Sequence, residues 1–218
     1  MVNLIKAFIY KELSTNHYIF VFTTNFLLLI LMTFKSVPSL KIIDINEAIV
    51  IFFITCKISI MLNELISQKI FKNFLFIDIK KIKLLVSVIA FYVIYLLLLL
   101  LIPFSVLFIL SNLTFPIIQR LLLYTLMGIA YITVTTLISI FCNGDTKSII
   151  VSIICLYIIP PIINNVSASN SYKTYFPTMY LDPATIFNFP IILSIIVLGT
   201  LVTLSLIGVN LILRKKEL

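Results

Sequence analysis

The stretch that decides the fold is LLVSVIAFYVIYLLLLLLIPFSVLFIL, residues 84–110. It contains no charged side chain, and an α-helix needs about 20 mainly apolar residues to cross the hydrocarbon core of a bilayer. The rest of the chain has the same character. Of its 218 residues 61% are apolar and only 11% are charged, whereas an ordinary soluble domain carries about 25% charged residues. A soluble core cannot bury this much apolar surface, so the sequence predicts an integral membrane protein.

Five further stretches are long and apolar enough to cross a membrane, and none alternates between apolar and polar residues as a barrel strand would. The six predicted spans are residues 17–34, 48–66, 84–110, 121–142, 148–166 and 188–213. The predicted fold class is therefore all-α, with six transmembrane helices. We predict no removable signal peptide, because the first long apolar run starts only near Tyr18 and no small-residue cleavage site follows it.

Six spans place both chain ends on one side of the membrane, and an excess of Lys and Arg marks the cytoplasmic side. One side carries Lys6, Lys11, Lys69, Lys72, Lys80, Lys81, Lys83, Lys147, Arg214, Lys215 and Lys216. The other side carries Lys35, Lys41, Arg120 and Lys173. The imbalance predicts a multi-pass protein of the cell membrane with both termini in the cytoplasm.

Positive charge gathers between the second and third spans, where five lysines lie within residues 69–83. Apolar and polar side chains alternate there at helical spacing, which is typical of a short amphipathic helix over about 69–80. One face would hold Phe71, Phe74, Leu75 and Asp78, and Lys72 and Asn73 would point elsewhere. Such a helix can lie on the membrane surface or dock into a groove of a soluble partner. An ordinary basic loop held by anionic lipid explains the lysines as well.

The N-terminus repeats this pattern over residues 2–13. Its apolar face holds Leu4, Ile5, Phe8, Ile9 and Leu13, and its polar face holds Lys6, Lys11 and Glu12. The segment is too short and too charged to cross a membrane, so we predict an interfacial helix that lies flat before the first span. The alternative is a frayed amphipathic tail.

The layout resembles that of a type-2 ABC exporter permease, the membrane subunit of a transporter driven by a separate ATPase. Members of that family have a flat N-terminal elbow helix, six spans, a Glu-led cytoplasmic segment with a short coupling helix, and an extracellular segment before the last span. The matching features here are Lys11-Glu12-Leu13, Glu64 at the end of the second span, the 69–80 segment and the proline-containing stretch at about 164–188. The Gly-Thr pair and the Pro that often flank the family's coupling helix are absent.

The resemblance implies an elbow made by Leu4, Phe8, Lys11 and Glu12. It also implies contacts with an ABC ATPase subunit through Glu64, Lys69, Phe71, Lys72, Phe74, Leu75, Asp78 and Lys80. A second permease subunit would complete a homo- or heterodimer within the lipid, and nucleic acid is not an expected partner. ATP and Mg would sit on the ATPase, so the chain itself would bind no cofactor or metal and would not be an enzyme.

The expected cargo follows from the predicted membrane helices, which are dominated by Leu, Ile, Val and Phe. Such walls suit a strongly charged solute poorly, so we expect outward movement of a hydrophobic or amphipathic molecule, such as a toxic peptide, a bacteriocin or a lipid-like compound. The Ile-, Lys- and Asn-rich, Trp-free composition is typical of a low-GC bacterium. Export of, or immunity to, a membrane-active antimicrobial peptide is the leading hypothesis.

Four residues are candidates for a translocation path. Lys57 lies in the middle of the second span, where a charge marks either a polar cavity or a snorkelling or structurally bonded side chain. Tyr131, Thr133 and Thr136 share the fourth span and predict either a mildly polar lining or hydrogen-bonded helix packing.

The segment before the last span holds the predicted external gate, Tyr175, Phe176 and Tyr180, and these aromatic residues could equally form a membrane-interface belt. Pro160-Pro161 predicts a break in the fifth span as it leaves the membrane, or a simple kink.

Three other classes of protein make different demands on the sequence. A non-transporting membrane anchor, assembly protein or direct immunity protein would need no ATPase. An intramembrane enzyme would need acid and His clusters, and His17 is the one histidine. A proton-driven transporter would need acids in mid-membrane, and Glu64, the nearest candidate, lies close to the end of its span. The three cysteines show no paired spacing and are interpreted as small apolar residues.

Overall fold

The computed structural model describes residues 6–8, 39–67, 81–110, 115–142, 147–166, 177–182 and 186–215. Within these ranges the regular structure is entirely helical, which confirms the predicted all-α class. The predicted first span at 17–34, the predicted coupling helix at 69–80 and most of the predicted elbow lie outside the described residues. Of the elbow, residues 6–8 are described and are helical.

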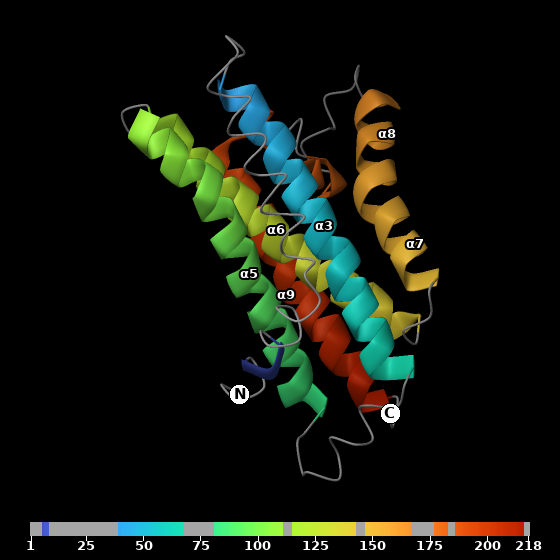
Figure 1. Ribbon diagram of the computed structural model, residues 1–218. Helices are drawn as coiled ribbons and strands as arrows, with labels where there is room; N and C mark the ends of the chain where they lie inside the picture. The colour runs from blue at the N-terminus through green and yellow to red at the C-terminus, as the bar shows by residue number, and fades with distance from the viewer. Residues whose placement is uncertain are drawn as a thin grey trace.

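In the described residues, five long helical rods form a bundle. Successive rods alternate in direction (Figure 1). They are α3 (Ser39–Ser67), α5 (Lys81–Leu110), α6 (Phe115–Phe141), the composite of α7 (Lys147–Ile153), η1 (Ile154–Ile158) and α8 (Ile159–Val166), and α9 (Ile191–Lys215). Two short 3₁₀ helices, η3 (Pro177–Leu181) and η4 (Ile186–Asn188), lie between α8 and α9.

Each rod contains a segment long and apolar enough to cross a membrane. These five candidate spans are Asp44–Ile66, Ile82–Ile102, Ile118–Phe141, Lys147–Asn164 and Ile191–Leu213. The described part of the chain is therefore compatible with a multi-pass membrane protein. The starts of α5 and α7 lie at one end of the bundle, and the starts of α3 and α6 lie at the other (Figure 1). By the bounds of these helices, the first end holds Lys81, Lys83 and Lys147 and is the predicted cytoplasmic end, and the second holds Asp44 and Arg120 and is the predicted outer end.

The helix α3 begins well before the apolar run that predicted the second span at 48–66. Its first turns carry Asp44, Asn46 and Glu47, and the last two are buried. Hydropathy marks only the apolar part of a helix, whereas the backbone stays helical as long as its hydrogen bonds are made. Because α3 starts earlier, it brings into the bundle polar side chains that the predicted span did not include.

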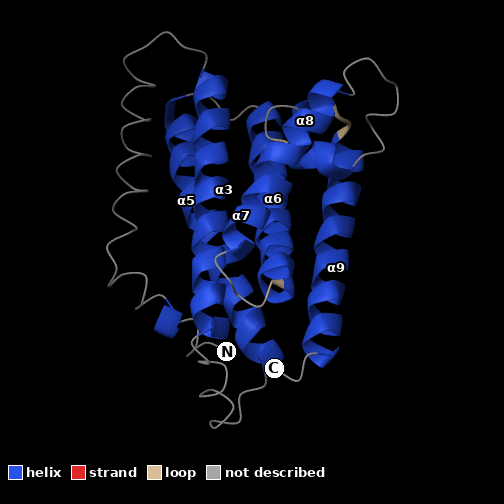
Figure 2. Cartoon of the chain, turned by 90° about the vertical axis from the view of Figure 1, so that its right-hand side faces the viewer, coloured by secondary structure: helices blue, strands red, loops and turns tan. Residues whose placement is uncertain are grey.

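The helix α6 is the centre of the bundle. It packs against α3, α5, α7 and α9, and Figure 2 shows it between α3 and α9. Gly128 lets α5 approach closely, because a Cβ at this position would lie only 2.4 Å from a Cδ atom of Leu96. Small residues at helix contacts are a general device of membrane helix packing.

Two rods are mostly uncovered. The candidate span in α7–α8 is 22% buried and that in α9 is 17% buried, whereas the other three are between 44% and 56% buried. On the α7–α8 rod, Ile150, Ile154, Ile158 and Ile162 recur at a spacing of four residues and are all exposed. Such a continuous apolar face is unfavourable in water and is suited to lipid or to another membrane helix.

Candidate functional site

Most residues of the predicted ATPase contact lie outside the described residues, namely Lys69, Phe71, Lys72, Phe74, Leu75, Asp78 and Lys80. Glu64 is half-buried in the last turns of α3. For the elbow, Leu4, Lys11 and Glu12 also lie outside, whereas Phe8 is buried with its ring centre 6.1 Å from that of Phe91 on α5. The described part of the N-terminus therefore packs against α5, and the coupling segment stays a prediction.

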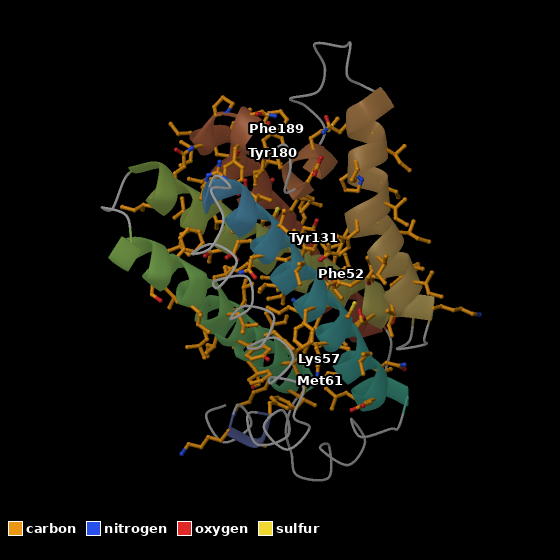
Figure 3. All side chains as sticks on the ribbon, turned by 45° about the horizontal axis from the view of Figure 1, so that its top comes forward. Phe52, Lys57, Met61, Tyr131, Tyr180 and Phe189 are labelled. Atoms are coloured by element: carbon orange, nitrogen blue, oxygen red, sulfur yellow. The ribbon has the colours of Figure 1, made fainter. Side chains whose placement is uncertain are left out.

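Lys57 is half-buried on α3, in the half of the helix nearer the predicted cytoplasmic end (Figure 3). Its Nζ atom lies 5.8 Å from the ring centre of Phe53, one turn away, which is within the range of a cation–π contact. The hydroxyl of Tyr92 donates to the backbone carbonyl of Lys57 at 3.3 Å and so joins α5 to α3. The aromatic neighbour favours a snorkelling or structurally bonded side chain, one of the two interpretations of Lys57 that the sequence left open.

Tyr131 occupies the junction between α6 and the break in the fifth rod. It is fully buried (Figure 3), and its hydroxyl donates to the carbonyl of Leu156 at 2.9 Å. The helix supplies no donor of its own to that carbonyl. An α-helical bond would come from position 160 and a π-helical bond from position 161, and both are prolines, which lack an N–H.

The fifth rod therefore differs from the prediction of a break at Pro160-Pro161. The π-helical turn η1 precedes the prolines, and α8 continues through them to Val166. The hydroxyl of Tyr131 lies where it can supply, from α6, a donor in place of the one that the prolines remove. The same hydroxyl also lies within hydrogen-bonding reach of the carbonyl of Leu181 in η3.

A second tyrosine extends this contact to α3. The rings of Tyr131 and Tyr157 meet edge to face at 5.0 Å, and Phe52 of α3 approaches Tyr157 at the same distance. The hydroxyl of Tyr157 is 3.1 Å from Oγ1 of Thr55, which itself donates to the carbonyl of Ile51 at 2.8 Å. The break in the fifth rod is thus tied to both α3 and α6 by paired aromatic and hydroxyl contacts.

Thr133 and Thr136, the other predicted path residues, are also buried. Their hydroxyls donate to carbonyls of their own helix, at 3.0 Å to Ala130 and at 2.7 Å to Ile132. Threonine hydroxyls in membrane helices are often satisfied in this way. The contacts favour helix packing for these two residues within one subunit.

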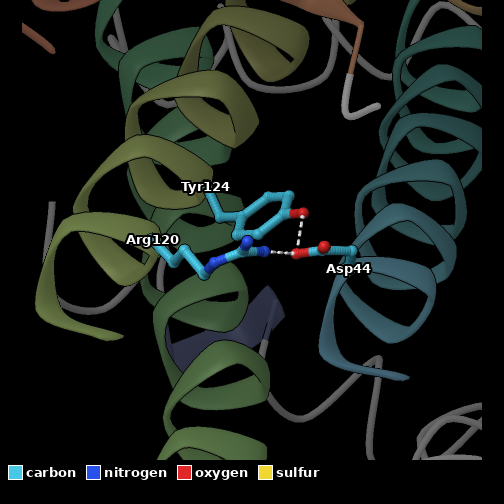
Figure 4. Close-up of polar contacts among 3 residues, drawn as sticks. All are labelled: Asp44, Arg120 and Tyr124. Atoms are coloured by element: carbon cyan, nitrogen blue, oxygen red, sulfur yellow. Dashed lines mark hydrogen bonds and ion pairs between the residues drawn. The ribbon is translucent and has the colours of Figure 1, made fainter. Parts of the chain in front are cut away.

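A charged cluster lies at the predicted outer end, between the parallel helices α3 and α6 (Figure 4). Asp44 accepts hydrogen bonds from the guanidinium of Arg120 and from the hydroxyl of Tyr124, the latter at 2.8 Å. The guanidinium also lies 4.3 Å from the ring centre of Phe187 in η4, and this ring meets Tyr124 edge to face at 5.3 Å. The cluster therefore joins three elements.

The segment of η3 and η4 is seated on the bundle rather than extended from it. Met179, Tyr180 and Ile186 are fully buried, and η3 contacts α6, α8 and α9. Of the predicted gate, Tyr175 and Phe176 lie outside the described residues. Tyr180 packs against Phe189 with ring centres 4.5 Å apart (Figure 3), so its side chain is part of the packing between this segment and the start of α9.

Sequence reasoning used Arg120 only as an outer charge and gave no role to Asp44. Tyr124, which shares a face of the fourth span with Tyr131, was a candidate for helix contacts or a mildly polar lining. A local signal existed, because Arg120 and Tyr124 are four residues apart on one helix face. The partner on α3 is 76 residues away in the chain and leaves no local pattern. The chain matches no protein-family model, and no characterised protein or solved structure matches it.

Proposed function

We propose that the chain is the permease subunit of an ATP-driven exporter of the type-2 ABC kind. It would move a hydrophobic or amphipathic molecule, such as an antimicrobial peptide, a bacteriocin or a lipid-like compound, out of the cell or the membrane. ATP and Mg would be bound by a separate ATPase. The observation that carries this proposal is the short segment before the last span, because an extracellular segment at this place is what the resemblance implies.

The packing of that segment supports the proposal that it moves during transport. It rests on α6, α8 and α9, and it follows a rod that contains a π-helical turn and two prolines. A π-helical turn is a frequent mark of a functional region in a helix. When packed helices shift, an element seated on their ends shifts with them.

The uncovered apolar faces of α9 and α7–α8 support the proposal that a second permease subunit packs there. Exposed isoleucines and leucines on α9 include Ile192, Ile196, Leu204, Ile207 and Leu211. The path residues Thr133 and Thr136 are closed off by packing within one chain. A passage would therefore form between two subunits, with lipid on the remaining apolar faces.

The test is co-purification with the ABC ATPase encoded beside the chain's gene. We expect a stoichiometric complex with the unmodified chain, and loss of that complex with Phe71→Asp or Phe74→Asp, which place a charge on the predicted apolar face of the coupling helix. Asn73→Asp adds the same charge to the opposite face and is the matched control. All variants must still insert into the membrane.

Two results would count against the proposal. If no ATPase binds, or if the phenylalanine variants bind as the control does, the lysines of the 69–83 segment are a topology signal only. A non-transporting anchor or direct immunity protein then becomes the leading interpretation. That class predicts protection of cells without any dependence on ATP hydrolysis.

A further inference from the structure

Glu47 is a carboxyl group enclosed by the bundle inside a candidate membrane span. Its side chain is 0% exposed, and in the part of the chain that the structure describes neither carboxyl oxygen has a hydrogen bond of ordinary geometry. The amide of Asn46, which is 2% exposed, is close enough to interact with the carboxyl, but its nitrogen also lacks a hydrogen bond of ordinary geometry. Buried polar groups are almost always hydrogen-bonded, so this carboxyl calls for a physical explanation.

The charged neighbours of Glu47 come from two helices. Asp44 lies three residues earlier on the same face of α3, and Tyr124 approaches Glu47 from α6. Arg120, one turn before Tyr124 on α6, is paired with Asp44. The other helices packed on α3 are α5 and α7. Their described lysines all lie at the end of the bundle away from Glu47. On α3 itself, Lys57 lies about 15 Å further along the axis at 1.5 Å per residue.

The charges of this group do not balance if every carboxyl is ionised. Asp44 and Glu47 would carry two negative charges, and Arg120 would supply one positive charge that is already paired with Asp44. An ionised Glu47 would then be buried beside the Asn46 amide, with no counter-charge of its own among the described residues. Burial of such a charge is strongly unfavourable, and a neutral carboxyl in the same place is far less so.

We propose that Glu47 is a proton-binding site of the membrane bundle, and that Arg120 becomes its partner when the proton leaves. In the arrangement described, the carboxyl is protonated and Arg120 pairs with Asp44. Loss of the proton to water at the outer side leaves a carboxylate one helical turn from Asp44. Positions three residues apart on a helix have Cβ atoms about 5–6 Å apart, so the guanidinium can move from one carboxylate to the other.

The remaining contacts make this exchange feasible and link it to the outer segment. Asp44 keeps a donor when Arg120 leaves, because the Tyr124 hydroxyl is 2.8 Å from its Oδ1 atom. The guanidinium also stacks on Phe187 of η4 at 4.3 Å. A shift of Arg120 toward Glu47 therefore removes a contact that holds η4. The site goes beyond the proposed export and does not depend on it.

The test is infrared spectroscopy of the purified chain in lipid nanodiscs, with ¹³C at the side-chain carboxyl of glutamate only. The chain has four glutamates, Glu12, Glu47, Glu64 and Glu217. At neutral pH we expect one carbonyl stretching band of a protonated carboxyl that shifts with the label. It should disappear in Glu47→Gln, which keeps the size of the side chain, and persist in Glu64→Gln. Circular dichroism and size exclusion confirm that each variant is folded.

Two outcomes would overturn the site. If Glu47→Gln and the unmodified chain give the same spectrum, Glu47 is ionised and has a partner that the geometry does not reveal. If the labelled band disappears in Glu64→Gln instead, the proton is held at the other end of the helix.

The exchange is tested by titrating the same band in Arg120→Gln. This variant removes the cation that favours the ionised form, so the proton should be held more tightly by about 10- to 1000-fold, the usual effect of a close opposite charge. Because only glutamate is labelled, any change at Asp44 does not contribute to the signal. An unchanged titration would show that Arg120 never pairs with Glu47, and the exchange would be discarded.

Discussion

Replacing Tyr131 by Phe removes one hydroxyl and leaves the buried ring and its contact with Tyr157 in place. The carbonyl of Leu156 then has no donor, because positions 160 and 161 are both prolines. A buried acceptor that loses its partner costs about 1–3 kcal/mol. Hydrogen bonds between membrane helices average about 0.6 kcal/mol and reach about 1.7. Since the fifth rod offers no substitute donor, we expect a loss of about 1–2 kcal/mol in the free energy of unfolding.

The assay is reversible unfolding of the purified chain in mixed micelles by sodium dodecyl sulfate. Tyr157→Phe is the matched control, because its hydroxyl contacts a threonine that already bonds the carbonyl of Ile51. We expect a loss of about 0.6 kcal/mol for the control, the membrane average. The explanation fails if Tyr131→Phe destabilises the chain no more than Tyr157→Phe does.

A second readout locates the effect. In η3 and just after it, the amide of Asp182 bonds the carbonyl of Met179, and the amide of Ile186 bonds that of Asp182. These amides should exchange hydrogen faster in Tyr131→Phe than in the control, because Leu181 lies beside them and also loses contact with the hydroxyl. Unchanged exchange there would show that Tyr131 does not hold the outer segment.

Three further predictions follow from the same geometry. In a background with both Pro160→Ala and Pro161→Ala, which restores the α-helical and the π-helical donor for Leu156, Tyr131→Phe should destabilise the chain by at least about 0.5 kcal/mol less than it does alone. Equal losses in unfolding experiments would contradict the role of the prolines. Gly128→Leu should lower the free energy of unfolding by about 1–3 kcal/mol through overpacking against Leu96. The control is Gly199→Leu, where a Cβ meets nothing within 4 Å, and its effect should stay within about 0.5 kcal/mol. Similar losses for the two variants would refute the close approach of α5 and α6. Asp44→Asn and Arg120→Gln should be less than additive in a double-mutant cycle of unfolding, with a coupling of about 0.5–3 kcal/mol, and strict additivity would show that the pair is not formed.

The sequence alone predicts the helical class well, because hydropathy reports directly what a bilayer requires. Residues 84–110 are apolar on every side, and the structure places them in α5 with Leu96 and Leu99 buried and Leu98 and Leu101 exposed. A helix that is apolar all round needs no knowledge of its neighbours to be recognised. Which face of the helix is buried cannot be predicted without knowledge of the neighbouring helices, because all faces have the same apolar composition.

The candidate site could not be predicted for a related reason. Asp44 and Glu47 precede the apolar run, so the hydropathy pattern placed them in a loop, and their partners lie on α6, far away in the chain. The double proline was visible, and it correctly indicated a special place in the fifth rod. What it could not indicate is that a tyrosine from another helix supplies the missing donor and lets the helix continue.

One face of α6 supplies several of the contacts that hold the outer segment, beside those that α8 and α9 make with η3. Arg120 and Tyr124 contact Phe187, and Tyr131 contacts Leu181. A cation–π contact is worth about 0.5–2 kcal/mol, an aromatic pair about 0.5–1.5 and a hydrogen bond between membrane helices up to about 1.7. Together they amount to a few kcal/mol, and reversing a 1:99 equilibrium takes about 5.5 kcal/mol. Withdrawal of Arg120 toward Glu47 removes one of these contacts, so loss of the proton from Glu47 would loosen the segment but would not displace it alone.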